Sequence, residues 1–540
     1  MLEQDRILPF TISRRAETHG DQVALQDVGG RACTYRGYDE ANRRWADAFR
    51  RQGVQPGQTV LTFFPNSFES LHCWLGLAWL RAIEVPINTQ FRGRMLEYLI
   101  ENSRAELMVT SERFLGQLGE VRPQVLSRLR SVIVPDLSGE PPQLGPPVIG
   151  GGEFLDLAEP AADLDGPAHY DVSCMIYTSG TTGPSKGVLV PWAELHQFPN
   201  AAPPGILDES SSYYACLPTF HVGGKSLAYM TALHASKAVL REVFSLSEFW
   251  SDVRAFRCNT TGLIGIMAQL LLTMPAQPDD ADNPLTTIQT APLFPEIEEF
   301  ERRFGVKTFT GYGMTEIGAP LYVGYEDRVN WRSCGRIRPG YELRIVDEHD
   351  EEVPDGEVGE LIVRSDRPWE LNSGYWGMPE KTAEAWRNGW FHTGDGFCRD
   401  GEGNYYFVDR LKDAMRKGGE NISSLEVEGH VREHPGVQEV AAIAAPSEFG
   451  HGEDEVKVLV IPKPGEDFDE AALLDFLVTA MPKFMLPRYV ELVEELPKTP
   501  TLRVRKVELR DDALNARTWD RVAGGYVDEA RWTAGTAADG

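Results

Sequence analysis

Cysteine is scarce in this sequence, and no two cysteines stand at the spacing of a metal-binding motif. Only seven of the 540 residues are cysteines, and no pair forms Cys-x-x-Cys. This odd number and wide scatter suggest neither a zinc site nor a disulfide framework. We therefore expect reduced thiols at Cys33, Cys73, Cys174, Cys216, Cys258, Cys334 and Cys398.

Long apolar runs and an excess of positive charge are also missing. No uninterrupted apolar stretch approaches the roughly 20 residues of a membrane-spanning helix, and the first residues, MLEQDR, do not begin a secretory signal. Lys and Arg number 53 against 81 Asp and Glu, for a formal net charge of −28, which disfavours nucleic acids and anionic membranes as partners. These absences predict a soluble, cytoplasmic protein without a membrane span or nucleic-acid partner, and they leave its oligomeric state open.

What the chain does contain is an alternation of helix and strand patterns that is typical of parallel α/β proteins. A length of 540 residues is too great for one hydrophobic core, so we expect several subdomains. Short strand patterns predict a small β-subdomain at residues 336–364, and residues 424–481 have the pattern of a compact α+β domain. Earlier helix patterns lie at residues 38–52, 67–82 and 95–103, strand patterns at 59–64, 85–88 and 107–110, and a Pro- and Gly-rich surface connection at 139–152.

One loop has the composition of a phosphate-binding site. Residues 177–187, YTSGTTGPSKG, lie between two short β-prone runs. Glycines let backbone N–H groups approach an anion without a Cβ in the way, hydroxyls add neutral donors, and a lysine adds charge. The spacing differs from a Walker A motif, which leads into a helix. The loop therefore predicts phosphate binding by Thr178, Ser179, Gly180, Thr181, Thr182, Gly183 and Lys186.

This loop and four further motifs, in order, resemble the adenylate-forming superfamily. That family comprises acyl- and aryl-CoA synthetases, firefly luciferase and the adenylation domains of peptide synthetases. Its members join a carboxylic acid to ATP as an acyl-adenylate and then pass the acyl group to a thiol. The resemblance implies ATP or AMP, CoA and Mg²⁺ as cofactors. The four motifs are GYGMTE at 311–316, WFHTGD at 390–395, DRLKD at 409–413 and KGGENI at 417–422.

The resemblance implies an α/β fold in two parts. A large N-terminal domain, residues 1–409, would hold the acyl and nucleotide sites in two α/β sheet subdomains and a small β-barrel. A small, mobile α+β C-terminal domain, residues 410–514, would rotate about a hinge at Lys412 between the two half-reactions. Residues 515–540 are rich in Ala, Gly and charge, and we expect a mobile tail there.

The resemblance also implies roles for single residues at the nucleotide. Thr315 would reach a phosphate, and Glu316 would bind Mg²⁺, which prefers one or two carboxylates beside substrate phosphates. Thr315 by itself would also suit a helix N-cap. Asp395 would accept hydrogen bonds from the ribose hydroxyls, Arg410 would lie near the sugar or the phosphates, and Tyr312 would stack on adenine.

On the acyl and CoA side, His221 would act as a gate between the acyl and pantetheine channels. Without the motif, His221 would be interpreted as a core histidine with a satisfied hydrogen bond. Residues 259–272 resemble the wall of the acyl pocket, and Thr290 stands in the loop that touches adenine, where the family has glycines before Ala-Pro. The CoA tunnel would be lined by Lys417, Gly418 and Gly419.

The chain departs from the family near its C-terminus. The family has Pro-Lys-Thr-x-x-Gly-Lys, whose last lysine serves adenylation, whereas here Leu502 replaces the glycine and Arg503 the lysine. A guanidinium is wider than an ammonium, and a leucine removes the backbone freedom of glycine. A register shift would instead give the role to Lys498, Arg505 or Lys506, but the flanking residues fit the unshifted register.

We therefore expect an acyl-CoA synthetase that acts through an acyl-adenylate on a carboxylic acid with a largely apolar body. Thiol transfer should be intact and adenylation weak or absent, so a separate enzyme would supply the adenylate. The catalytic set is Lys186, Thr315, Glu316, Lys412, Arg503 and His221.

Three alternatives stay open. One is a complete ligase that uses Arg503, and another is a free-standing adenylation domain that charges a carrier protein. Phe220-His221 stands where such domains have the Phe-Asp that holds an α-amino group, which argues against amino acids as substrates. The third is a non-catalytic nucleotide-binding protein, and it is disfavoured because Lys186, Glu316, Asp395 and Lys412 are all present.

Overall fold

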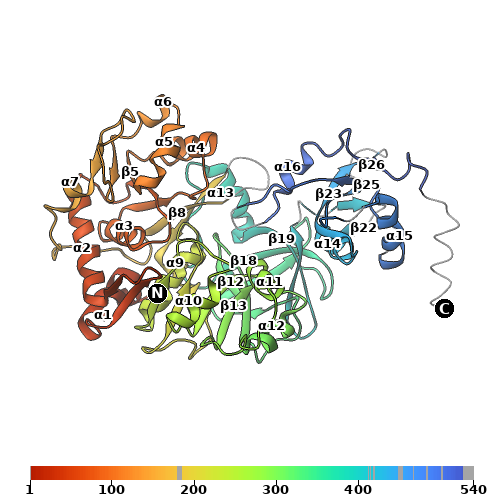
Figure 1. Cartoon of the computed structure of the whole chain (residues 1–540), viewed down its shortest axis with the longest axis horizontal. Helices are drawn as coiled ribbons and strands as arrows, with labels where there is room; N and C mark the ends of the chain where they lie inside the picture. The colour runs from red at the N-terminus through yellow and green to blue at the C-terminus, as the bar shows by residue number, and fades with distance from the viewer. Residues whose placement is uncertain are drawn as a thin grey trace.

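The computed structural model of this chain describes residues 2–178, 185–410, 413, 415–417, 420–447, 454–465, 468–481, 485–499 and 503–526. Figure 1 shows a large body, coloured red to green-blue along the chain, with the blue C-terminal elements set to one side of it. Its mixed helices and sheets confirm the predicted α/β class. No helix in these described ranges is long and apolar enough to cross a membrane.

The first subdomain is built on a seven-stranded sheet, parallel except for its last hairpin. Its central strands are buried on both faces because helices cover each side. In spatial order the strands are β7 (Val148–Gly150), β6 (Ser131–Val134), β5 (Leu107–Thr110), β3 (Thr59–Phe63), β4 (Ile83–Pro86), β8 (Val172–Thr178) and β9 (Lys186–Pro191). The helices are α2 (Tyr35–Arg51), α3 (Phe68–Trp79), α4 (Gly93–Ser103), α5 (Leu115–Gly119), α6 (Pro123–Leu126), α7 (Gly151–Leu155) and α8 (Trp192–Leu195), and 3₁₀ turns lie at Glu112–Phe114 and Pro199–Ala201.

The second subdomain is the parallel part of a thirteen-stranded sheet. Helices α1 (Leu8–Thr18) and α9 (Val222–Leu233) cover one face, while α10 (Phe249–Ala255), α11 (Gly265–Thr273) and α12 (Ile297–Phe304) cover the other. The strands are β14 (Lys307–Met314), β13 (Thr287–Ala291), β12 (Thr260–Ile264), β10 (Ser212–Ala215), β11 (Lys237–Leu240), β1 (Val23–Asp27) and the antiparallel edge strand β2 (Ala32–Thr34), and a 3₁₀ turn at Gln4–Arg6 precedes α1.

Antiparallel strands continue this sheet into the β-subdomain. The β-subdomain spans residues 318–410, well beyond the predicted 336–364. The prediction was too short because the remaining strands carry polar functional residues that break the alternation of apolar and polar side chains. The strands are β15 (Gly318–Val323), β16 (Ser333–Ile337), β17 (Tyr341–Val346), β18 (Gly359–Ser365), β19 (Phe391–Arg399) and β20 (Tyr405–Arg410), with α13 (Pro379–Ala385) and a 3₁₀ turn at Arg387–Gly389.

The C-terminal elements form a separate four-stranded sheet and a short hairpin around their own core. The strands are β21 (Met415–Lys417), β22 (Glu420–Ile422), β23 (Val437–Pro446), β24 (Asp454–Pro462), β25 (Tyr489–Leu492) and β26 (Trp519–Asp520), and the helices are α14 (Ser424–Arg432), α15 (Glu470–Ala480) and α16 (Lys506–Arg510).

Two segments differ from their predicted character. The connection expected at residues 139–152 contains the edge strand β7 and the start of α7; three half-buried residues carry too little pattern to reveal a strand. The mobile tail predicted for residues 515–540 is wrong for residues 515–520, since β26 pairs with β25 and Thr518 accepts a 3.0 Å hydrogen bond from buried Lys457. Residues 527–540 lie outside the described residues.

A buried ion pair joins the first two subdomains. Lys225 of α9 contacts Glu84 of β4, and the side chains are 1% and 4% exposed. The Lys225 ammonium also lies 3.9 Å from the centroid of the Trp74 ring, and Thr62 donates a 3.0 Å hydrogen bond to Glu84. Because removing one partner would leave an uncompensated buried charge, this pair fixes α9, and therefore His221 at its N-terminus, against the first sheet.

Candidate active site

The ends of β9 and β14 bring Lys186 and Glu316 together through Tyr375, a residue that the sequence motifs did not reveal. The Lys186 ammonium lies 4.5 Å from the centroid of the Tyr375 ring, and the Tyr375 hydroxyl donates a 3.2 Å hydrogen bond to Glu316 Oε1. Tyr375 also bridges to Val188 of β9. Gly374 and Gly377, both at positive φ, are the sequence signal for a turn at Tyr375. Nothing in the sequence indicates that this turn contacts Lys186 and Glu316.

Glu316 is a buried carboxylate. Glu316 is only 6% exposed. Burial raises the pKa of its carboxyl group, while the Tyr375 hydroxyl and the charges of Lys186 and Arg410 act to lower it. Asn372, another residue missed by the sequence motifs, donates both its backbone N–H and its side-chain amide to the Glu316 carbonyl, at 3.1 and 2.7 Å. The carboxylate is thus held in place and available to a cation or a donor.

Thr315 lies in a tight turn between β14 and β15, where Met314 pairs with Gly318. No helix begins there, so the alternative of a helix N-cap is wrong. Thr178 ends β8, opposite Lys186 in the register. Ser179, Gly180, Thr181, Thr182 and Gly183 lie outside the described residues.

Asp395 is the centre of a second cluster. Its Oδ2 accepts a 2.7 Å hydrogen bond from the Tyr312 hydroxyl, and its Oδ1 lies 3.5 Å from Nε of Arg410 on the paired strand β20. Burial raises the pKa of Asp395, and the charge of Arg410 offsets part of this effect. Gly394, at φ 70°, allows the turn, and its N–H donates to Glu360 at 2.9 Å. Glu360 was missed because it stands alone in a strand pattern.

Arg503 belongs to the C-terminal elements, and its charge interacts with those of this cluster. Arg503 and Thr499 exchange two hydrogen bonds, from Thr499 N to Arg503 O at 2.7 Å and from Arg503 N to Thr499 Oγ1 at 3.0 Å. The side chain keeps contact with solvent, yet its surroundings lower the pKa of the guanidinium, first by burial and then by the charge of Arg410, with Asp395 and Tyr312 acting in the opposite direction. Leu502 lies outside the described residues.

The other basic residues near Arg503 are engaged within the C-terminal part. Lys498 lies 2.7 Å from Glu439, Arg505 2.5 Å from Glu508, and Lys506 2.7 Å from Glu428. Each of these three side chains therefore makes an ion pair within the C-terminal elements. Arg503, by contrast, interacts electrostatically with Asp395 and Tyr312, which act to raise its pKa.

His221 caps α9 without a side-chain capping bond. Its ring centroid is 4.8 Å from that of Phe220, and among the described residues its buried Nε2 has no hydrogen-bond partner. The interpretation as a satisfied core histidine is therefore wrong. Burial lowers its pKa to about 4, helped by the charge of Arg503.

We predict that His221 does not titrate in the working range of the enzyme. With a pKa of about 4, the ring is neutral at every pH from about 6 to 8, which spans the ordinary range of a histidine. The rate ratio between the wild type and His221→Gln, measured with preformed acyl-adenylate and CoA, should therefore stay constant across that range. A ratio that changes with a midpoint near the ordinary histidine pKa would contradict this prediction.

Of the three residues expected to line the CoA tunnel, the structure describes Lys417. Lys417 of β21 pairs with Glu455 of β24 at 2.6 Å, and burial lowers its pKa. Gly418, Gly419 and the expected hinge Lys412 lie outside the described residues. Within the described ranges, no three His, Cys, Asp or Glu side chains gather as a metal-binding cluster.

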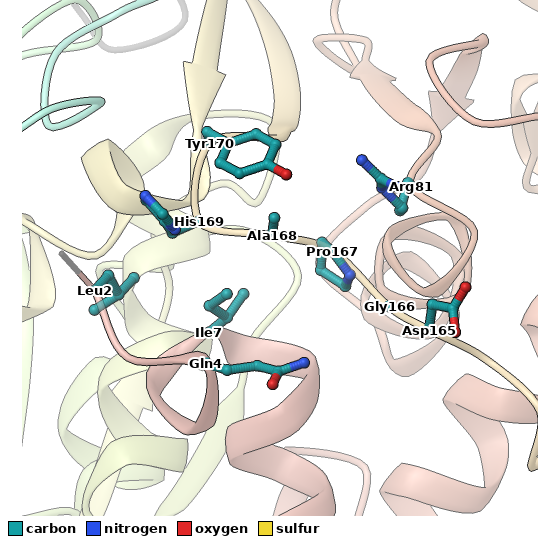
Figure 2. Close-up of a pocket in the computed structure, with 10 residues that line it drawn as sticks. All are labelled: Leu2, Gln4, Ile7, Arg81, Asp165, Gly166, Pro167, Ala168, His169 and Tyr170. Atoms are coloured by element: carbon teal, nitrogen blue, oxygen red, sulfur yellow. The ribbon is translucent and has the colours of Figure 1, made fainter.

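A separate cavity lies before the start of β8, away from its Thr178 end. Figure 2 shows His169 and Tyr170 on one side of it, Ile7 of the N-terminal segment below, and Arg81 and Asp165 opposite. Its volume is about 280 Å³. Arg81 makes a two-bond ion pair with Asp171, at 2.8 and 3.0 Å. None of the predicted site residues lines this cavity, so it is not the candidate active site.

Comparison with known proteins identifies the family. Residues 12–376, more than half of the chain, match the AMP-binding enzyme family, and residues 426–502 match the C-terminal domain of AMP-binding enzymes. This chain is an AMP-binding enzyme. It is 31% identical over 516 residues to the crotonobetaine/carnitine–CoA ligase of Salmonella agona and 32% identical over 509 residues to that of Citrobacter koseri, with 92% of this chain and 97% of each relative covered.

Solved structures agree with this assignment. The AMP-binding enzyme superimposes on an anthranilate CoA ligase in complex with anthranoyl-AMP with a TM-score of 0.81 and 25% identity, over 96% of this chain and 98% of that one. A benzoate CoA ligase from Burkholderia xenovorans shares the fold, with a TM-score of 0.80 and 24% identity over 93% and 99% of the chains. The AMP-binding enzyme belongs to the class of acid–thiol ligases.

Proposed function

We propose that this enzyme forms an acyl-CoA thioester through an acyl-adenylate, and that the thiol-transfer half-reaction is its efficient step. One observation carries the proposal: Lys186 and Glu316 meet through Tyr375, while Asp395 contacts Tyr312 and Arg410. The charge of Arg503, from the C-terminal elements, also interacts with Asp395. Cations for the phosphates and a carboxylate for the ribose are what an acyl-adenylate needs.

In this proposal the nucleotide spans both clusters. The phosphates are bound by Lys186, Thr315 and the loop from Thr178 to Gly183, and the ribose hydroxyls donate to Asp395. Mg²⁺, when bound, neutralises phosphate charge, and Glu316 fits as its protein ligand because Mg²⁺ takes one or two carboxylates together with phosphate oxygens. Tyr312 would present its ring to adenine while its hydroxyl stays on Asp395.

CoA would enter after the C-terminal domain, residues 410–514, rotates about Lys412 against residues 1–409. The arrangement with Arg503 near Asp395 suits the adenylation half-reaction. Lys417 and Glu455, its 2.6 Å partner, both belong to the rotating domain. The rotation would therefore carry this ion pair along and bring Gly418 and Gly419 to line the pantetheine tunnel beside His221.

Weak adenylation follows in this proposal from the identity of residue 503. The charge of Asp395, the intended ribose acceptor, acts on the pKa of Arg503, so we assign the guanidinium to the sugar end of the site rather than to the reacting carboxylate. The rival, a complete ligase that uses Arg503, is supported by the same proximity, because it brings a positive charge close to the nucleotide. A separate enzyme that supplies the adenylate is needed only if adenylation by this enzyme is weak, and not if it is a complete ligase.

The acid is proposed to be small. The curated relatives are ligases of crotonobetaine and carnitine, and a solved structure of the same fold holds anthranoyl-AMP. The relatives support CoA rather than a carrier protein as the thiol acceptor. Incubation with CoA and benzoyl-, butanoyl- or anthranoyl-adenylate, followed by mass spectrometry of the thioester, tests the proposal. Hydrolysis of all three adenylates without any thioester would reject thiol transfer to CoA.

Replacing Gly419 by tryptophan is expected to obstruct CoA and spare the adenylate. The proposed tunnel follows a backbone without a side chain at Gly419, and overpacking typically costs 1–3 kcal/mol, so the KM for CoA should rise about tenfold while AMP affinity stays constant. Gly401→Trp is the matched control, because Gly401 lies in an exposed turn with no atom near the added side chain. An unchanged KM in Gly419→Trp would place the tunnel elsewhere.

A further inference from the structure

On the face of the second sheet that α1 and α9 cover, one buried tyrosine hydroxyl has no hydrogen-bond partner among the described residues. Tyr213 of β10 is 1% exposed, and its hydroxyl has no hydrogen-bond partner among the described residues. Its neighbour Tyr214 points to the opposite face and donates a 2.7 Å hydrogen bond to Asp252. A buried hydroxyl without a partner costs free energy, so Tyr213, unlike Tyr214, has a hydrogen-bonding group that a bound molecule could satisfy.

The Tyr213 hydroxyl lies over Gly262 of β12. A Cβ placed on Gly262 would be 2.6 Å from Tyr213 Oη and 3.7 Å from Leu217 Cδ1, and the same Leu217 atom is 3.6 Å from a Cβ on Gly223. Gly223 is the second residue of α9, two positions after His221. A hydroxyl, a leucine and two glycines thus surround one region directly behind the proposed gate.

A second polar side chain flanks this region. Gly262 pairs with Gln289 of β13 in the register, and Gln289 pairs with Phe309 of β14. Paired residues of parallel strands share a face, so Gln289 stands beside Gly262 on the face covered by α9. It is half-buried. Strand β14 leads from Phe309 to Tyr312 and the Asp395 cluster, so an adenylate bound there as proposed would have this region next to it.

We propose that this region is the far end of the acyl site, and that Tyr213 and Gln289 hydrogen bond a polar group on the acid. This inference rests on the proposed function. The substrate is then a short carboxylic acid whose otherwise apolar body carries one hydroxyl, carbonyl or amide group. Because the Tyr213 hydroxyl occupies the space over Gly262, a long hydrocarbon chain finds no room there.

Binding of matched probes tests the proposal. The probes are non-reactive acyl-sulfamoyl-adenosines in four pairs that differ only in hydroxyl against methyl: 4-hydroxybutanoyl and pentanoyl, 5-hydroxypentanoyl and hexanoyl, 3-hydroxybenzoyl and 3-methylbenzoyl, and 4-hydroxybenzoyl and 4-methylbenzoyl. By calorimetry, the wild type should bind the hydroxyl member of at least one pair about tenfold more tightly, because an unmet buried polar group penalises the methyl analogue.

Three variants separate specificity from stability. Tyr213→Phe or Gln289→Met should abolish the preference for the hydroxyl probe while AMP affinity is retained, and Tyr213→Phe should not lower the Tm, since it removes an unpartnered hydroxyl. Tyr214→Phe, the control on the opposite face, should lower the Tm through loss of the bond to Asp252 and keep the preference.

Equal or tighter binding of the methyl member in every pair would overturn the inference, as would a hydroxyl preference that survives both Tyr213→Phe and Gln289→Met. If neither AMP nor any probe binds, the proposed function itself fails. The two failures are therefore distinguishable.

Discussion

Supplied with preformed acyl-adenylate and CoA, this enzyme is expected to make thioester about 10²–10³-fold faster than it releases pyrophosphate from ATP and the free acid. A missing transition-state contact of this kind is worth about 3–4 kcal/mol, or roughly two to three powers of ten in rate. The two half-reactions are measured separately, by pyrophosphate release without CoA and by thioester formation without ATP.

The physical reason lies in the geometry of residue 503. Adenylation brings a carboxylate to the α-phosphate, and a lysine ammonium is a compact charge that fits between them. The planar guanidinium of Arg503 is wider and binds carboxylates as a fork, and its surroundings include Asp395 and the like charge of Arg410. In the proposed mechanism thiol transfer does not use Arg503, so we expect that half-reaction to be spared.

Substitution at the same position supplies the control. The double variant Leu502→Gly/Arg503→Lys should raise pyrophosphate release toward the rate of thiol transfer and leave thioester formation from the adenylate unchanged. Brisk pyrophosphate release by the wild type, which depends on both ATP and acid, would contradict the split and leave a complete ligase that uses arginine.

Asp395→Ala is expected to weaken the binding of AMP by about ten- to hundredfold. A charged hydrogen bond contributes on the order of 1.5–3 kcal/mol, and Asp395 is the buried carboxylate on which Tyr312 and Arg410 converge. The variant also leaves the Tyr312 hydroxyl without its partner, so the orientation of the adenine platform is lost together with the ribose acceptor. Calorimetry with AMP measures the effect.

Two companion variants isolate the carboxylate. Asp395→Asn keeps an oxygen for the Tyr312 hydroxyl and removes only the charge, so its folding should be normal and its AMP affinity reduced. Asp355→Ala removes an exposed carboxylate of the same β-subdomain, one that pairs with Arg399 at 2.7 Å, and should leave affinity unchanged. Wild-type affinity in both Asp395 variants would refute the ribose assignment.

The sequence alone determined the fold class and the position, between two strands, of the loop that we predict to bind phosphate. These features are local: helix and strand periodicity, glycines and hydroxyls within eleven residues, and motifs whose order survives in the printed chain. The predicted strand at residues 107–110 coincides with β5, and β8 and β9 flank the loop as an antiparallel pair. Such features can be predicted from the sequence because they depend on residues that are close together in the chain.

Only the tertiary structure decided which residues meet. Tyr375, which also lies against Lys186, contacts Glu316 across 59 positions of sequence, and Tyr312 contacts Asp395 across 83. Glu84 and Lys225, 141 positions apart, hold α9 against the first sheet, and the Tyr213 hydroxyl lies over Gly262. Such contacts depend on strand order and on how helices cover each sheet, and a single tyrosine, glutamine or arginine in the sequence has no local signature for a partner that the fold brings from elsewhere.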